Sequence, residues 1–179
     1  MVDIRNKAED GRNIVESIVR LVPGFRGYHQ KEDRRETDKI LREHLAAKLD
    51  RLRASLNPII RGLTDAGDLD LTGRTDIVRK LLEKITYRLR YASYGYAGFF
   101  DAIKVDQEDL DRLYEFDAAL LDRIQALEHG LAQLGAMTGE AERFKEMLRP
   151  IQDAVSEFDT HLDTRRSLIE RDEKHVDSR

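Results

Sequence analysis

The stretch that decides the fold is residues 45–63, which read LAAKLDRLRASLNPIIRGL. Apolar residues recur in it at alternating intervals of four and three, at Leu45, Leu49, Leu52, Leu56, Ile59 and Leu63. This spacing keeps the apolar side chains on one face of an α-helix, whereas a strand alternates its side chains with a period of two. The stretch therefore predicts a long amphipathic helix over about 30–66, with charged residues such as Asp38 and Arg42 on its outside.

Three more stretches carry the same helical spacing and predict helices over about 75–97, 107–135 and 139–170. Thr75 or Asp76 can cap the first of these helices, because short polar side chains accept hydrogen bonds from the backbone N–H groups of the first turn. A shorter amphipathic helix is expected over about 8–22, where Pro23-Gly24 ends it. Long amphipathic helices with short connections predict an all-α fold, an elongated antiparallel four-helix bundle.

Length and composition agree with this architecture. The chain has 179 residues, 40% of them hydrophobic, which suits one globular domain. We expect an N-terminal helix and turn over 1–24, a helical-bundle domain over 25–170 and a frayed charged tail over 171–179. The absence of cysteine excludes disulfides and thiolate metal sites. The sequence shows neither an apolar run of membrane-spanning length nor a signal-peptide core.

Charge is divided unevenly along the chain. Residues 1–105 carry a formal charge of +5 and residues 106–179 a charge of −9, within a total of −4. Neighbouring helices of opposite charge would explain this division without any ligand, and acids and bases also alternate within the basic half. The alternative is that the basic half faces an anionic partner while the acidic half stays in water.

Asp117 is the most informative single residue, since it occupies a position in its helix where the spacing calls for leucine. A buried carboxylate without a partner is costly, so we expect a partner inside the protein. The candidates are Arg88 or Arg90, a tyrosine hydroxyl, or Arg165, which occupies an apolar position of the last helix. A charged pair between the two helices would set their register. A pocket acid at the centre of the fold is the functional alternative.

The segment from Tyr87 to Phe100 concentrates aromatic residues and glycines. Its aromatic members are Tyr87, Tyr91, Tyr94, Tyr96, Phe99 and Phe100. Arg88 and Arg90, with Lys80 and Lys84 upstream, form a basic stripe beside them. The segment is interpreted first as a plug that fills a corner of the fold. Its alternative is a platform on which the bases of RNA or single-stranded DNA stack.

The search for catalytic motifs finds none. The sequence lacks a phosphate-binding loop, a dinucleotide-binding glycine motif and a nucleophile elbow. It also lacks the Glu-x-x-His pairs that a di-metal helical core requires, and Glu157 with His161 is expected to be an exposed helical pair. We therefore expect no enzyme, no bound metal and no cofactor.

Residues 22–28, VPGFRGY, followed by Lys31-Glu32, Arg34-Arg35 and Asp38-Lys39, resemble the start of small uncharacterised prokaryotic all-helical proteins. The resemblance implies a cytoplasmic bacterial or archaeal protein and brings no activity with it. The chain is also similar to phage-shock, membrane-remodelling coiled-coil proteins in placing a short amphipathic helix before a long charged one. It departs from them at Pro58 and at its aromatic-glycine segment.

Three functions are consistent with these features. The leading hypothesis is a non-enzymatic scaffold or protein–protein interaction module with a protein partner or a second copy of itself. A peripheral membrane protein acting through residues 8–22 is the second, although Glu9, Asp10 and Glu16 offset the basic residues that such helices favour. Binding of RNA or single-stranded DNA through residues 87–100 is the third, and the acidic total charge argues against it.

Overall fold

The computed structural model describes residues 4–28, 34–92, 107–137 and 139–176, and side chains over 13–28, 34–92, 109–137 and 139–165. Within these residues the chain forms helices and no strand. The helices are α1 (Ile4–Leu21), α2 (Arg34–Asp65), α3 (Leu69–Tyr91), α5 (Gln107–Gly135) and α6 (Ala141–Val176). The all-helical class predicted from the apolar spacing is therefore confirmed.

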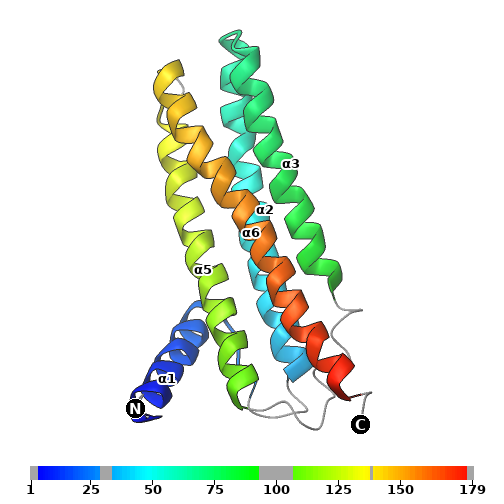
Figure 1. Cartoon of the computed structure of the whole chain (residues 1–179). Coiled ribbons are helices and arrows are strands. Elements are labelled where there is room, and N and C mark those ends of the chain that lie inside the picture. The colour runs from blue at the N-terminus through cyan, green and yellow to red at the C-terminus, as the bar shows by residue number, and fades with distance from the viewer. Residues whose placement is uncertain (1–3, 29–33, 93–106, 138, 177–179) are drawn as a thin grey trace.

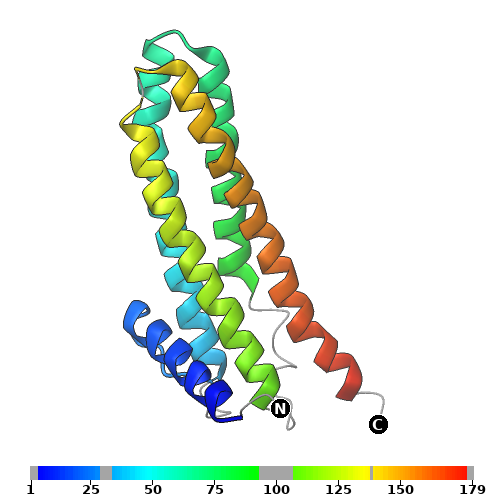
Figure 2. The same cartoon turned by 60° about the vertical axis from the view of Figure 1, so that its left-hand side comes forward.

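The four long helices lie side by side along one axis, and α1 crosses α5 at one end (Figures 1 and 2). The chain passes upward in Figure 1 along α2 and α5 and downward along α3 and α6. The most extensive packing joins α2 to α3 and α5 to α6, while α2 with α5 and α3 with α6 join these two pairs. The starts of α2 and α5 therefore lie at the same end as the ends of α3 and α6.

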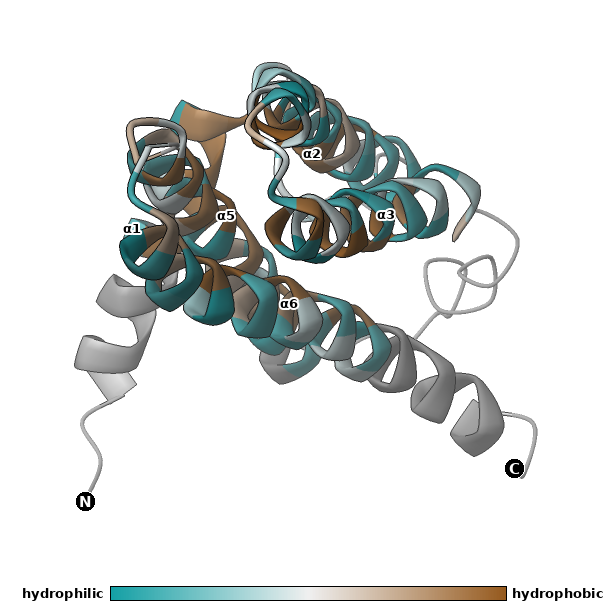
Figure 3. Ribbon diagram, turned by 90° about the horizontal axis from the view of Figure 1, so that it is seen from above, coloured by the Kyte–Doolittle hydropathy of each residue, from teal (hydrophilic) through white to brown (hydrophobic). Residues whose placement is uncertain are grey.

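The predicted apolar faces meet in a common interior. Leu45 of α2, Leu120 of α5 and Val155 of α6 are almost completely buried in one cluster. Figure 3 shows hydrophobic residues on the facing sides of the helices and hydrophilic residues outside. Gly130 permits α5 to approach α6 closely, because a Cβ atom there would lie 3.2 Å from Cγ1 of Ile151. Burial of these stripes is the main force that stabilises the helices.

The predicted start of α3 was wrong. Thr75 and Asp76 do not cap the helix, which begins at Leu69 with Asp68 as its N-cap. The Asp68 carboxylate accepts a hydrogen bond from the backbone N–H of Leu71 at 3.0 Å. Thr75 instead lies buried inside α3 and its hydroxyl donates to the carbonyl of Leu71. Burial of Leu71 against the core extends the helix through Gly73, which lies before the start predicted near residue 75.

Other helix ends differ from the predictions by a few residues. Helix α1 begins at Ile4, before the predicted residue 8, and α2 begins at Arg34, after the predicted residue 30. Helix α6 continues to Val176, beyond the end predicted at residue 170. The part of the chain that the structure describes contains no helix long and apolar enough to cross a membrane.

Candidate functional site: a buried ion-pair network

The ion pair between Asp117 of α5 and Arg165 of α6 is the centre of the candidate site. Nε of Arg165 donates to Oδ1 of Asp117 at 2.7 Å, and both side chains are buried. This is one of the pairings expected from the apolar positions that the two residues occupy. The pair links α5 to α6 at the end of the molecule where α5 begins.

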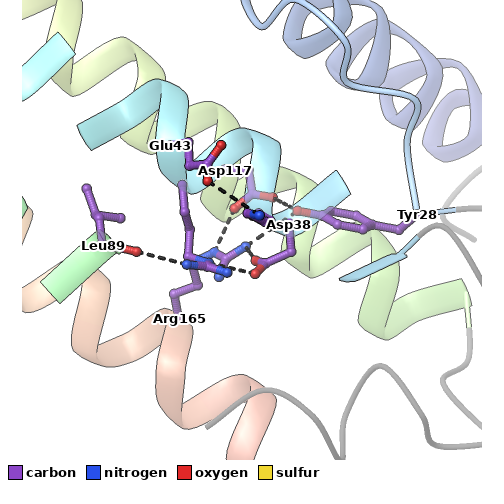
Figure 4. Close-up of polar contacts among 8 residues, drawn as sticks. Tyr28, Asp38, Glu43, Leu89, Asp117 and Arg165 are labelled. Carbon is purple, nitrogen blue, oxygen red and sulfur yellow. Dashed lines mark hydrogen bonds and ion pairs between the residues drawn. The ribbon is translucent and has the colours of Figure 1, made fainter. Parts of the chain in front are cut away.

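Two residues of α2 extend the pair into a network. Nη2 of Arg165 donates to Oδ1 of Asp38 at 2.8 Å, and Nε of Arg42 donates to Oδ2 of Asp38 at 2.7 Å. Nη1 of Arg42 donates to the backbone carbonyl of Leu89 at 2.9 Å, which satisfies an acceptor in the last turn of α3. The network thus connects all four long helices, and Figure 4 shows these contacts.

Tyr28 joins the N-terminal segment to the same network. Its hydroxyl donates to Oδ2 of Asp117 at 2.8 Å, and its backbone N–H donates to the hydroxyl of Tyr114 (Figure 4 shows the first contact). The chain reaches this position through a turn in which Gly24 and Gly27 adopt φ values of 85° and 83°, a backbone conformation that favours glycine. Phe25 packs edge-on against Tyr28, with ring centroids 5.5 Å apart.

Among the described residues, the network contains two carboxylates and two guanidinium groups, so the formal charges of these four side chains balance. Burial raises the pKa of the Asp117 carboxyl above its ordinary value, and the Arg165 guanidinium opposes that shift. Burial and then the Asp117 carboxylate raise the pKa of the Tyr28 phenol well above its ordinary value. The Tyr28 hydroxyl therefore stays protonated and serves as a hydrogen-bond donor at neutral pH.

The arrangement favours a structural role over acid–base chemistry. Each oxygen of Asp117 and of Asp38 accepts a hydrogen bond from within the protein. Among the described residues, Nε2 of His44 is the one buried side-chain nitrogen or oxygen atom without a hydrogen-bond partner. A network in which each carboxylate oxygen already binds a donor of the protein has a geometry that suits fixing the register of four helices.

Asp38, Arg42 and Tyr28 were not predicted by number as members of the network, although a tyrosine hydroxyl was among the partners expected for Asp117 and that expectation is confirmed. Asp38 and Arg42 were expected on the outside of α2, and that expectation was wrong because both are buried. A signal for Asp38 exists: the four-and-three spacing continues backward from Leu45 through Leu41 to residue 38. Arg42 follows Asp38 by one helical turn, the separation of an ion pair on one helix face. Tyr28 carries no comparable signal, because the turn that places it lies outside any helix.

The aromatic and basic residues predicted at the end of α3 are distributed differently. Tyr87 and Tyr91 do not plug the interior: they are 59% and 67% exposed and stack on each other with ring centroids 5.4 Å apart. Arg88 pairs with Asp159 and Asp163 of α6, and Arg90 pairs with Asp50 of α2. Neither arginine contributes to the Asp117 network in these ion pairs. Tyr94, Tyr96, Phe99 and Phe100 lie outside the described residues.

Ion pairs between helices account for part of the uneven charge distribution. Lys48 of α2 binds Glu128 of α5 at 3.1 Å. Lys84 of α3 binds Asp159 of α6 at 2.7 Å. Basic side chains of the first half of the chain thus meet acidic side chains of the second half at the two contacts that join the helix pairs, as complementary helix charges predict.

No group of three or more histidine, aspartate or glutamate residues that could hold a metal ion occurs in the described part of the chain. Glu157 and His161 of α6, considered above as the nearest approach to a metal motif, both contact Arg123 of α5. Nη1 of Arg123 lies 2.9 Å from Glu157 Oε2, and Nη2 lies 3.2 Å from His161 Nε2.

A double-mutant cycle tests the charge balance. We expect Arg165→Met to lower the free energy of unfolding by about 3–5 kcal/mol, because it leaves two buried carboxylates against one guanidinium. The double variant Asp117→Leu/Arg165→Met removes one charge of each sign and leaves the balanced Asp38–Arg42 pair. It should therefore be more stable than Arg165→Met alone in urea denaturation. If the double variant loses as much free energy of unfolding as the two single variants lose together, the two charges are not coupled and the prediction is contradicted.

His44 of α2 provides a pH-dependent prediction. Burial, and next Lys48 and Arg51, lower the pKa of its imidazole below the ordinary value of 6.5, while Glu128 of α5 acts in the opposite direction. The unfolded chain therefore binds a proton at His44 more readily than the folded chain does. Above pH 6.5 the imidazole is neutral in both states and the folded protein keeps its full stability. As the pH falls from 6.5 through the lowered pKa, the unfolded chain is protonated first, and the free energy of unfolding decreases.

We accordingly expect His44→Gln to be less sensitive to acid than the unchanged chain. Urea denaturation at a series of pH values from neutral to mildly acidic should show that the stability difference between the two chains shifts in favour of the variant as the pH falls. A stability difference that is constant across this range would contradict the prediction.

Comparison with protein-family models, with curated proteins and with solved structures finds no significant match to this chain. Its function must accordingly be argued from its own geometry.

Proposed function

We propose that residues 25–170 form an elongated antiparallel four-helix bundle, a single cooperative unit that acts as a non-enzymatic scaffold or protein–protein interaction module. The charged residues of the interior support this role. Asp38 and Arg42 of α2, Asp117 of α5 and Arg165 of α6 bind one another, so these buried charges are engaged within the protein. A cytoplasmic location is part of the same proposal.

The observation that carries the proposal is the stacked pair Tyr87 and Tyr91, which is exposed on α3. Most large apolar and aromatic side chains of the described residues are buried, so this exposed group is unusual within the molecule. Tyrosine is enriched at protein interfaces, because it offers a large contact area together with a polar hydroxyl. A rigid helical frame that presents tyrosines outward suits the binding of another protein.

A peripheral membrane role is supported by one specific observation. Val19 and Leu21 of α1 remain about half exposed on the two sides of Ile18, which is buried against the rest of the protein. Helix α1 thus has more apolar surface than its packing covers. Nucleic-acid binding receives less support, because Arg88 and Arg90 are each engaged by carboxylates that would also repel phosphates.

The proposal is tested by purifying the affinity-tagged full chain from its native cells at low salt and measuring its mass by size-exclusion chromatography with light scattering. We expect a stable species larger than the 20.7 kDa monomer. Tyr87→Ser/Tyr91→Ser should diminish that species. Leu69→Ser, which changes an exposed leucine at the other end of α3, is the matched control and should not. A strict monomer without a stoichiometric partner would count against an interaction module.

A further inference from the structure

The outward face of α3 carries a regular stripe of residues that lie outside the core and remain exposed. Ile77, Lys80, Lys84, Tyr87 and Tyr91 follow one another at intervals of three, four, three and four, and all are exposed. The stripe is about 21 Å long at 1.5 Å per residue. Its spacing is that of a helix-packing seam, yet α3 packs on α2 and α6 through its other faces (Figure 3).

Apolar and aromatic groups occupy both ends of the stripe. Ile77 is 47% exposed at one end, and the stacked Tyr87–Tyr91 pair forms the other. Because the two rings already stack on each other, little side-chain freedom remains to be lost when a partner covers them. These positions are suited to anchor a partner helix laid along α3.

Positive charge occupies the middle of the stripe. The side chains of Lys80 and Lys84 are 67% and 58% exposed. Lys80 pairs with Asp76 at 2.9 Å and Lys84 with Asp159 at 2.7 Å, but an ammonium group has three N–H donors and can bind a further carboxylate. Helix α3 as a whole contains six basic residues against three acidic ones. Although these basic residues already pair with carboxylates, the exposed ammonium groups of Lys80 and Lys84 favour a partner that places acidic residues over the middle of the stripe.

Two other occupants fit this face less well. A second copy bound through the same stripe in an antiparallel twofold pair would place Lys84 against its own counterpart at the centre, where like charges repel. A nucleic-acid strand carries a phosphate at every nucleotide, so it would place negative charge against Glu83 and Asp163, which border the stripe and are 45% and 66% exposed, as well as against the lysines. A helix can place acidic residues over the lysines and apolar residues over the tyrosines.

From this arrangement we propose that the outward face of α3 is a docking site for an acidic amphipathic helix of a partner protein. The apolar residues of that helix contact Ile77, Tyr87 and Tyr91, and its carboxylates bind Lys80 and Lys84. The inference rests on the proposed interaction function and specifies its surface and the chemistry of its partner.

The test uses the full chain and three synthetic three-heptad helical peptides. The first has a leucine seam flanked by glutamates, the second has the same seam flanked by lysines, and the third is a scrambled version of the first. Fluorescence anisotropy measures the binding of each peptide at low and at physiological salt. We expect the acidic peptide to bind, more weakly as salt increases, and the other two peptides not to bind.

Matched variants locate the site. Tyr87→Ser/Tyr91→Ser should weaken binding of the acidic peptide at least about tenfold, because interface tyrosines carry a large share of binding energy. Lys80→Gln/Lys84→Gln should weaken it and flatten its salt dependence. Lys145→Gln/Arg149→Gln removes the same amount of charge from exposed positions of α6 and should leave binding unchanged. Circular dichroism checks that every variant remains folded.

Several outcomes would overturn the inference. The first two are a failure of the acidic peptide to bind and equal binding of the acidic and basic peptides. A third is an α6 variant that weakens binding as much as the α3 variants do. The last two are self-association that depends on concentration and is abolished by the tyrosine substitutions, and tighter binding of single-stranded DNA to the same face. If the peptides fail while a native assembly still depends on Tyr87 and Tyr91, the partner chemistry is wrong and the interaction function survives. If no native assembly forms but the acidic peptide binds, the proposed interaction function is wrong and the peptide-binding chemistry of the α3 face survives.

Discussion

The ion pair between Asp117 and Arg165 is the constraint on which the rest of the structure depends. Apolar stripes hold helices together, but leucine contacts alone allow neighbouring helices to slide or exchange partners. A buried charge permits no such freedom, because a displacement leaves it without a partner at considerable cost. By including Asp38 and Arg42, the network ties α5 and α6 to α2 and reaches the last turn of α3. Tyr28 then binds the N-terminal segment to the same point.

Much of the fold and part of the site could be predicted from the sequence. The four-and-three spacing of Leu45 to Leu63 locates a helix and its buried face, because both follow from helical periodicity. The expected contact between Asp117 and Arg165 is present, since each interrupts an apolar stripe at a position that must be buried.

The errors have physical causes of their own. Asp38 and Arg42 were placed outside because charged residues usually are, but each neutralises the other and both become suited to the interior. The start of α3 was misplaced because several residues near it can cap a helix, and the burial of Leu71 decides which one does. Tyr28 could not be predicted, because a turn and two glycine conformations determine where its hydroxyl lies.

The proposed function follows from a difference between groups that bind one another within the protein and groups that remain exposed. Charges at the centre are used within the protein, and cross-helix pairs such as Lys48 with Glu128 use others. The exposed face of α3 differs, because its tyrosines contribute little to the core and its lysines keep most of their surface. A frame stabilised internally can present such a face in a fixed geometry. That is the property an interaction module requires.

The most direct test of the central claim is hydrogen exchange of arginine Nε–H groups followed by NMR. Nε–H of Arg165 donates to Asp117 and Nε–H of Arg42 donates to Asp38, both inside the protein. These two protons should exchange with solvent only when the molecule opens, whereas the exposed Arg61 should exchange rapidly. An Arg165 proton that exchanges as fast as that of Arg61 would contradict a buried network.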